Sequence, residues 1–161
     1  MVSLMKLGKY YKLAIAILLT ELIGGGIGSV FTLSSISTWY ASLNKPSFTP
    51  PGAVIGIVWT ALYFIMGVAL WLVWEHMPKS RNAIILYSSQ LALNVLWSFL
   101  FFYLRSPLYG LVGIAFLWVA VAATMASFYK ISKSAAGLFV PYILWVSFAA
   151  YLNYSVFLLN H

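Results

Sequence analysis

The chain has 161 residues, of which 63% are hydrophobic and 7% are charged, with a formal net charge of +7. Soluble domains carry about 25% charged residues, so this composition excludes a globular surface that faces water on all sides. The chain contains no cysteine, which excludes disulfide bonds and thiolate metal ligands.

Five apolar runs follow one another along the chain, each about 20 residues long, which is the length of a helix that crosses a membrane. Helices are expected because backbone polar groups in hydrocarbon must be hydrogen-bonded within their own segment. The sequence therefore predicts an all-α integral membrane protein with a single domain over residues 1–161. Its fold class is a bundle of five transmembrane helices, at about residues 13–33, 53–74, 83–104, 108–129 and 135–159.

The starts of four of these spans carry residues typical of helix starts. Candidate N-caps precede them at Thr49, Ser80, Ser106 and Ser134. Prolines that suit a first helical turn stand at Pro50, Pro51 and Pro107.

The first span contains Glu21, the only acidic or basic residue inside any of the five. An ionisable group in a membrane is costly, so a functional role is expected. The alternative is a protonated side chain that hydrogen-bonds a neighbouring helix. Gly24 and Gly28 are spaced for close helix approach, either within the bundle or at a dimer seam.

The first connection, WYASLNKPSFTPPG at residues 39–52, is the only long one. Its prolines restrict its backbone, because proline fixes φ and also limits the residue before it. We expect a stiff loop at the mouth of the bundle.

Aromatic and amide residues recur at helical spacing in the second, third and fifth spans. At about 1.5 Å per residue, many of them fall in one layer toward the end of the bundle that carries the first connection. This layer contains Trp59, Tyr63, Asn94, Trp97, Trp145 and Phe148. An apolar pocket with a few convergent polar groups is typical of a small-ligand site. The alternative is ordinary packing of aromatic side chains and amide bonding between helices.

The basic residues fall unevenly on the two ends of the predicted spans. One end holds Lys6, Lys9, Lys12, Lys79, Arg81, Lys130 and Lys133, and the other holds Lys45 and Arg105. The positive-inside rule therefore predicts that the N-terminus is inside and the C-terminus outside. Because the charge is explained as an orientation signal, no nucleic acid is expected as a partner.

Four sequence blocks stand in order along the chain: WYASLNKPSFTPP, WTALYFIMG, QLALNVLWS and PYILWVSFAAYLN. With them the chain resembles the TspO/MBR family of tryptophan-rich sensory and translocator proteins, also called peripheral-type benzodiazepine receptors. The resemblance implies a five-helix bundle, often a homodimer, with a pocket beneath the first loop. Family ligands are tetrapyrroles such as protoporphyrin IX, benzodiazepine-type drugs and, in animal members, cholesterol. Tyr154 is followed by no basic residue, so strong sterol recognition is not expected.

The layer and the resemblance together define the candidate site. The predicted ligand-binding residues are Tyr40, Pro51, Trp59, Tyr63, Asn94, Trp97, Trp145, Phe148 and Ala149. Trp39, Tyr40 and Phe48 are expected to form a lid over the pocket, and Lys45 is expected to meet an anionic group of the ligand.

Three functions follow from this site. The first is a membrane receptor or sensor of protoporphyrin-like ligands, with the tetrapyrrole as ligand and no required cofactor or metal. The second is light-dependent porphyrin degradation, for which the resemblance suggests Trp59 and Trp145. The third is a transporter of porphyrin, lipid or sterol, with Glu21 available for proton coupling. Membrane lipid and a second copy of the chain are the other expected partners, in a prokaryotic cell membrane.

Overall fold

The computed structural model describes residues 2–160, and residues 2–9 by their backbone alone. Within this part, five helical units are long and apolar enough to cross a membrane: Tyr10–Leu33, Gly52–Trp74, Arg81–Tyr103, Pro107–Tyr129 and Lys133–Leu159. The predicted all-α five-helix bundle is confirmed. We refer to residues 10–33 as the first span.

Three of the five units are built from more than one helical segment. The first combines α1 (Val2–Thr20), the π-helix η1 (Glu21–Ile27) and α2 (Gly28–Leu33), and the third combines α5 (Arg81–Ser98) with the π-helix η2 (Phe99–Tyr103). The fifth divides into α7 (Lys133–Leu138) and α8 (Val140–Leu159), with Pro141 in the first turn of α8. The remaining helices are α4 (Gly52–Trp74), α6 (Pro107–Tyr129) and the short α3 (Trp39–Ser42) within the first connection.

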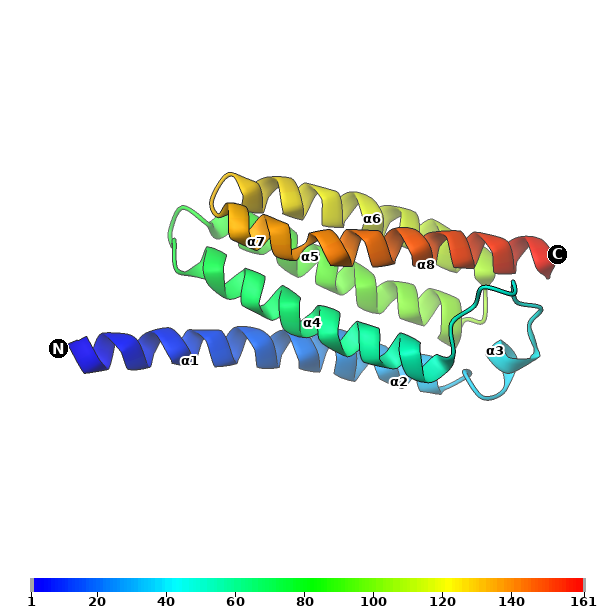
Figure 1. Cartoon of the computed structure of the whole chain (residues 1–161). Coiled ribbons are helices and arrows are strands. Elements are labelled where there is room, and N and C mark those ends of the chain that lie inside the picture. Colours follow the sequence, from blue (N-terminus) through cyan, green and yellow to red (C-terminus); the bar gives the residue numbers. More distant parts are fainter. Residues whose placement is uncertain (1, 161) are drawn as a thin grey trace.

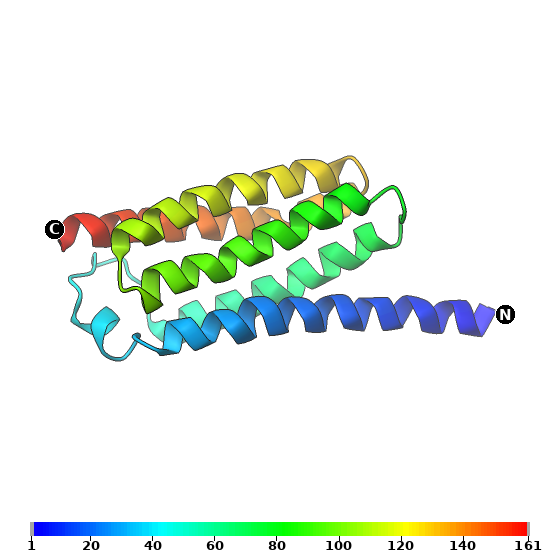
Figure 2. The ribbon, with the colours of Figure 1, turned by 180° about the vertical axis from the view of Figure 1, so that it is seen from behind.

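The helices run antiparallel to their neighbours along the chain, and the two termini lie at opposite ends of the bundle (Figure 1, Figure 2). The first connection and the C-terminus share one end, which we call the loop end. We call the other the N-terminal end. There, Lys12 of α1 pairs with Glu75 just beyond α4, at 3.5 Å between Nζ and Oε1.

The helix starts follow the predictions in part. Ser106 caps α6, because its Oγ accepts a hydrogen bond from the Tyr109 N–H at 3.2 Å. Ser80 stands at the N-cap of α5, but its side chain makes no capping bond. The prediction for Ser134 is wrong. Ser132 caps α7 instead, since the helix begins at Lys133 and the Ser132 Oγ accepts from the Ala135 N–H at 3.2 Å.

The predicted cap at Thr49 is also wrong. The N-cap of α4 is Pro51, two residues later. The Thr49 hydroxyl donates to the Pro46 carbonyl at 2.7 Å, so it stabilises a turn of the connection instead of a helix start.

The first span packs on α4 through glycines. A Cβ on Gly67 would lie 2.6 Å from the Cα of Ile17, so the backbones of α4 and α1 touch here. Gly24 faces the ring of Tyr63 on α4, and a Cβ on Gly28 would lie 3.6 Å from the Ser98 Oγ on α5. The Gly24–Gly28 pair therefore packs within the chain, which is the first of the two expected roles.

Replacing Gly67 by alanine is expected to destabilise the fold by about 1–3 kcal/mol, because the added methyl group meets backbone atoms that cannot turn aside. The measurement is the free energy of unfolding in detergent, by titration with a denaturing detergent. Gly137→Ala is the matched control, since a Cβ there meets nothing within 4 Å. It is expected to be neutral or to stabilise by up to about 1 kcal/mol. Equal effects of the two changes would contradict the close contact.

Candidate functional site

A cavity of about 360 Å³ lies in the loop-end half of the bundle, between the first span, α4, α5, η2, α8 and the first connection. Small-ligand sites measure about 300–1,000 Å³, so the cavity is of that class and near its lower limit. Both π-helices border it, through Gly24 and Gly25 of η1 and Phe101 and Phe102 of η2. Single π-turns in helices are frequent at functional sites.

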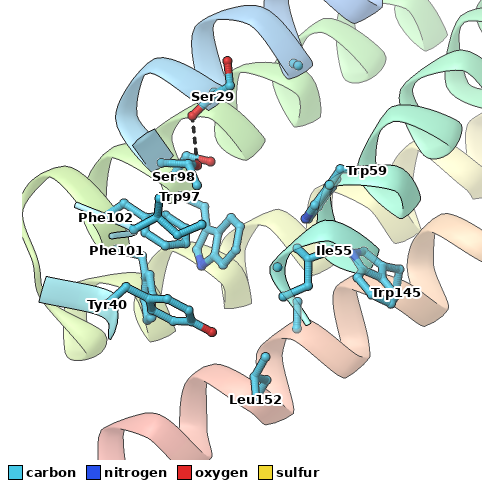
Figure 3. A pocket seen from close by; sticks show the side chains of 18 of the residues that line it. Ser29, Tyr40, Ile55, Trp59, Trp97, Ser98, Phe101, Phe102, Trp145 and Leu152 are labelled. Carbon is cyan, nitrogen blue, oxygen red and sulfur yellow. Dashed lines mark hydrogen bonds between the residues drawn. The ribbon is translucent and has the colours of Figure 1, made fainter. Parts of the chain in front are cut away.

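The structure brings seven of the nine predicted ligand-binding residues to the wall of this one cavity: Tyr40, Trp59, Tyr63, Trp97, Trp145, Phe148 and Ala149. They come from the connection, α4, α5 and α8. Figure 3 shows Tyr40, Trp59, Trp97 and Trp145 around the same space. Their contact with a ligand stays a prediction.

The aromatic wall runs through ring contacts from α4 to α5 and η2, and a separate pair of rings stands on α8. The ring of Trp59 stacks on Tyr63, with 5.5 Å between centroids, and lies 6.1 Å from Trp97. Trp97 in turn stacks on Phe101 at 6.0 Å. On α8, the rings of Trp145 and Phe148 are 5.4 Å apart. Flat apolar faces of this kind suit a flat, aromatic ligand.

Asn94 does not line the cavity but lies in the core beneath it, 1% exposed. The Tyr63 hydroxyl donates to its Oδ1 at 2.6 Å, and its Nδ2 donates to the Tyr142 hydroxyl at 3.2 Å. Tyr142 then donates to the Gln90 Oε1 at 2.8 Å. We call Tyr63, Asn94, Tyr142 and Gln90 the buried polar chain. It ties α4, α5 and α8 together, because a polar group unpaired in such a core costs about 1–3 kcal/mol.

Pro51 also lies off the cavity wall. Its carbonyl accepts hydrogen bonds from the N–H groups of Val54 at 2.9 Å and Ile55 at 3.2 Å, so it starts α4. The next residue, Gly52, is on the wall.

The predicted lid residues pack around the cavity without lining it, apart from Tyr40. Trp39 meets the ring of Phe101 edge-on at 5.5 Å, and Phe48 stacks on Tyr151 at 5.3 Å. The ring of Tyr40, which lines the cavity, lies 5.5 Å from the ring of Phe102 between centroids. Burial raises the pKa of the Tyr40 phenol above its ordinary value of 10.0, so this hydroxyl stays protonated at neutral pH.

Lys45 differs most from its expected role. Its ammonium donates to three backbone carbonyls, those of Tyr40 at 2.8 Å, Leu43 at 2.9 Å and Ala41 at 3.2 Å. It also lies 5.0 Å from the Tyr40 ring centroid. These bonds satisfy carbonyls at the C-terminal end of α3. They use all three N–H groups of the ammonium, so none is directed to the cavity. Lys45 thus holds the connection together.

The connection is fastened to the end of α8 by a pair of asparagines. The Asn44 N–H donates to the Asn160 Oδ1 at 2.9 Å, and the Asn160 Nδ2 donates to the Asn44 carbonyl at 2.9 Å. This reciprocal pair closes the loop end over the cavity.

Glu21 lies off the cavity, in a groove on the outer side of α4. Among the described residues, its carboxyl makes no hydrogen bond or ion pair. The expected alternative, a hydrogen bond to a neighbouring helix, is therefore not present.

Wall residues that were not among the predicted ligand-binding residues come from every part of the wall, and the first span contributes a group of small ones. Gly25, Ser29 and Thr32 line the cavity, but small residues carry no aromatic or charge signal. The four-residue spacing of Gly24, Gly28 and Thr32 was the available signal, since it marks one helix face. Within the described residues, no group of three metal-ligating side chains occurs.

Comparisons with known proteins give one consistent result. The model of the TspO/MBR family matches residues 16–159. The chain is similar to the tryptophan-rich protein TspO of Archaeoglobus fulgidus, with 44% identity over 91% of this chain and 95% of that protein. It is 39% identical to the human translocator protein, over 92% of this chain and 90% of that one. With the tryptophan-rich sensory protein of Cereibacter sphaeroides it shares 39% identity, over 76% and 77% of the two chains.

The hydrogen bonds of the buried polar chain predict that changes of Tyr63 and Asn94 have coupled effects on stability. Asn94→Leu leaves the buried Tyr63 hydroxyl without an acceptor and is expected to cost about 1–3 kcal/mol of unfolding free energy. Tyr63→Phe should then cost less in that variant than in the wild type, with a coupling of at least about 0.5 kcal/mol. Unfolding of the four proteins in detergent measures this coupling.

Ser147→Ala is the control for that cycle. The Ser147 Oγ accepts from the Trp118 Nε1 at 2.8 Å, outside the buried polar chain and at an exposed position. Its loss is expected to change stability by less than about 0.5 kcal/mol. Strict additivity of the Tyr63 and Asn94 changes would contradict the assigned hydrogen bond.

Proposed function

The chain belongs to the TspO/MBR family and is an integral, multi-pass membrane protein, and on this premise we propose that it is a receptor or sensor of tetrapyrroles such as protoporphyrin IX. The observation that carries the proposal is the cavity wall, where three tryptophans and two tyrosines surround one space within the bundle. A tetrapyrrole is flat and largely apolar, so its faces match stacked indole and phenol rings.

The carboxylates of such a ligand need water or hydrogen-bond donors. Tyr40, which lines the cavity from the first connection, supplies one hydroxyl donor at the loop end. Because the Lys45 ammonium is bonded to three carbonyls, Arg105 is the other Lys or Arg side chain that the described residues offer at this end. Arg105 is exposed, with φ of 54°, in the turn between η2 and α6.

Binding in the dark tests the receptor proposal. Protoporphyrin IX added to the purified protein is expected to quench tryptophan emission saturably. Trp59→Phe and Trp145→Phe should each weaken affinity by about tenfold, or about 1.4 kcal/mol, because a smaller ring stacks over less of the ligand. Trp118→Phe is the control, since Trp118 is exposed and lies off the cavity. The absence of saturable quenching at micromolar ligand would overturn the proposal.

A second candidate is light-dependent degradation of the bound porphyrin. It is favoured by the position of Trp59 and Trp145, both on the cavity wall and therefore within reach of one ligand. Under illumination in air, the Soret absorption of the bound porphyrin is expected to fall in the wild type and to fall more slowly in either Trp→Phe variant, compared at equal occupancy. A Soret band that bleaches equally in all three proteins would argue against this activity.

The proposal also includes the arrangement in the membrane. We place the N-terminal end inside and the loop end outside a prokaryotic cell membrane, supported by Lys12, Lys79, Arg81, Lys130 and Lys133 at the N-terminal end. Ser47→Cys in the connection should react with an impermeant maleimide on intact cells, and Ser134→Cys should not; the reverse result would invert the topology. A homodimer is expected as well, and cross-linking of the protein in its native membrane checks it.

A further inference from the structure

A groove on the lipid-facing side of α4 runs beside the cavity. Glu21 lines it together with α4 residues that include Ala53, Ile57 and Phe64. Ile57 is 71% exposed and Phe64 is 51% exposed, so this side of α4 meets lipid. Gly56 and Thr60 line both the groove and the cavity. The two spaces therefore meet at the seam between the first span and α4.

The half of this seam toward the N-terminal end is closed. Gly67 admits the backbone of Ile17 in direct contact, and the Tyr63 ring fills the space in front of Gly24 and Gly25. The ion pair between Lys12 and Glu75 joins the two helices at their far end. No ligand can pass at these levels without separating packed backbones.

The half toward the loop end is built differently. Here α2 packs on α5 and η2 and makes at most marginal contact with α4. A Cβ added to Gly52 or Gly56 would meet nothing within 4 Å. On the opposite side of the seam stand Gly28 and Ser29, which also lack large side chains. At these positions the seam is lined by small residues, which stand between larger wall residues such as Leu33 and Ile55.

From these observations we infer that the seam between α2 and α4 is a lateral opening, through which a flat apolar ligand passes between the bilayer and the cavity. The groove is where the ligand first rests against the protein. The inference rests on the proposed function, because it names the path of the ligand to the proposed site. Apolar ligands concentrate in lipid, so a path from the bilayer avoids their transfer through water.

Two further observations support this path over one through the loop end. The connection closes that end by the reciprocal bonds of Asn44 with Asn160 and by the three bonds of Lys45. The cavity of about 360 Å³ is also small for a four-ring ligand. Parting of α2 and α4 would enlarge it without breaking any of those bonds.

The test is the kinetics of protoporphyrin IX binding to the protein in lipid nanodiscs, followed by tryptophan quenching. Gly56→Leu places a bulky side chain in the seam, in space that holds no other atom within 4 Å of its Cβ. The association rate is expected to fall by about tenfold, because the side chain obstructs the passage. The equilibrium affinity is measured separately, since Gly56 also lines the cavity. Gly137→Leu is the control, because Gly137 is equally unobstructed and lies in α7 at the other end of the bundle.

A side chain that merely intruded into the cavity would weaken affinity through faster dissociation and leave association unchanged, and that result would overturn the inference. So would equal association rates in Gly56→Leu and the wild type. Ser29→Leu, on the opposite side of the seam, repeats the measurement if Gly56→Leu does not fold. Failure of the wild type to bind protoporphyrin IX would instead overturn the proposed function, and with it this passage.

A last measurement separates the two paths. Because the chain has no native cysteine, Asn44→Cys and Asn160→Cys can be joined by a bismaleimide to lock the connection onto α8. The locked protein should bind protoporphyrin IX with an association rate close to that of the unlocked variant. A large fall in the association rate after cross-linking would show that the ligand passes through the loop end.

Discussion

The phenol of Tyr63 joins four parts of this bundle at the base of the cavity. Its ring lies against Gly24 and Gly25 of η1 and stacks on Trp59 of its own helix. Its hydroxyl donates to Asn94 of α5, which donates to Tyr142 of α8. Because a buried hydroxyl or amide without a partner is costly, these helices cannot shift relative to one another without a penalty. The rest of the structure is organised about this level.

On one side of Tyr63 the bundle is packed, and on the other it opens. Toward the N-terminal end, glycine–backbone contact and stacked rings such as Tyr87 on Phe128 leave little space. Toward the loop end, the first span leaves α4 and packs on α5 and η2, and the cavity occupies the space that results. The connection closes this half through Lys45 and Asn44, whose bonds go to the backbone and to the end of α8. This division into a packed half and an open half is consistent with a site that takes up a ligand within a rigid bundle.

Sequence reasoning found most of the aromatic side chains of the cavity wall, because position along a helix follows directly from the rise per residue. Trp59, Trp97 and Trp145 fall in one layer by counting alone, and the structure brings them to one space. Asn94 falls in the same layer but points into the core, since depth along an axis does not give the direction around it. Lys45 could not be predicted, because its three carbonyl partners come together only when the connection folds on itself. The cap of α7 was misplaced by two residues for a local reason: Ser132 and Ser134 are equally suitable in composition.

The sequence by itself determined that lipid surrounds most of the chain, how many helices are long and apolar enough to span a membrane, and in which layer the aromatic side chains gather. These follow from hydrophobicity, run length and helical spacing, which act along the chain and need no partner. Only the tertiary structure decided which face of each helix meets the cavity, that Glu21 stands outside it, and that glycines form the seam beside α4. Those features depend on the packing of helices far apart in sequence, and glycine has no side chain that could reveal in advance whether its neighbour is backbone, a ring or an opening.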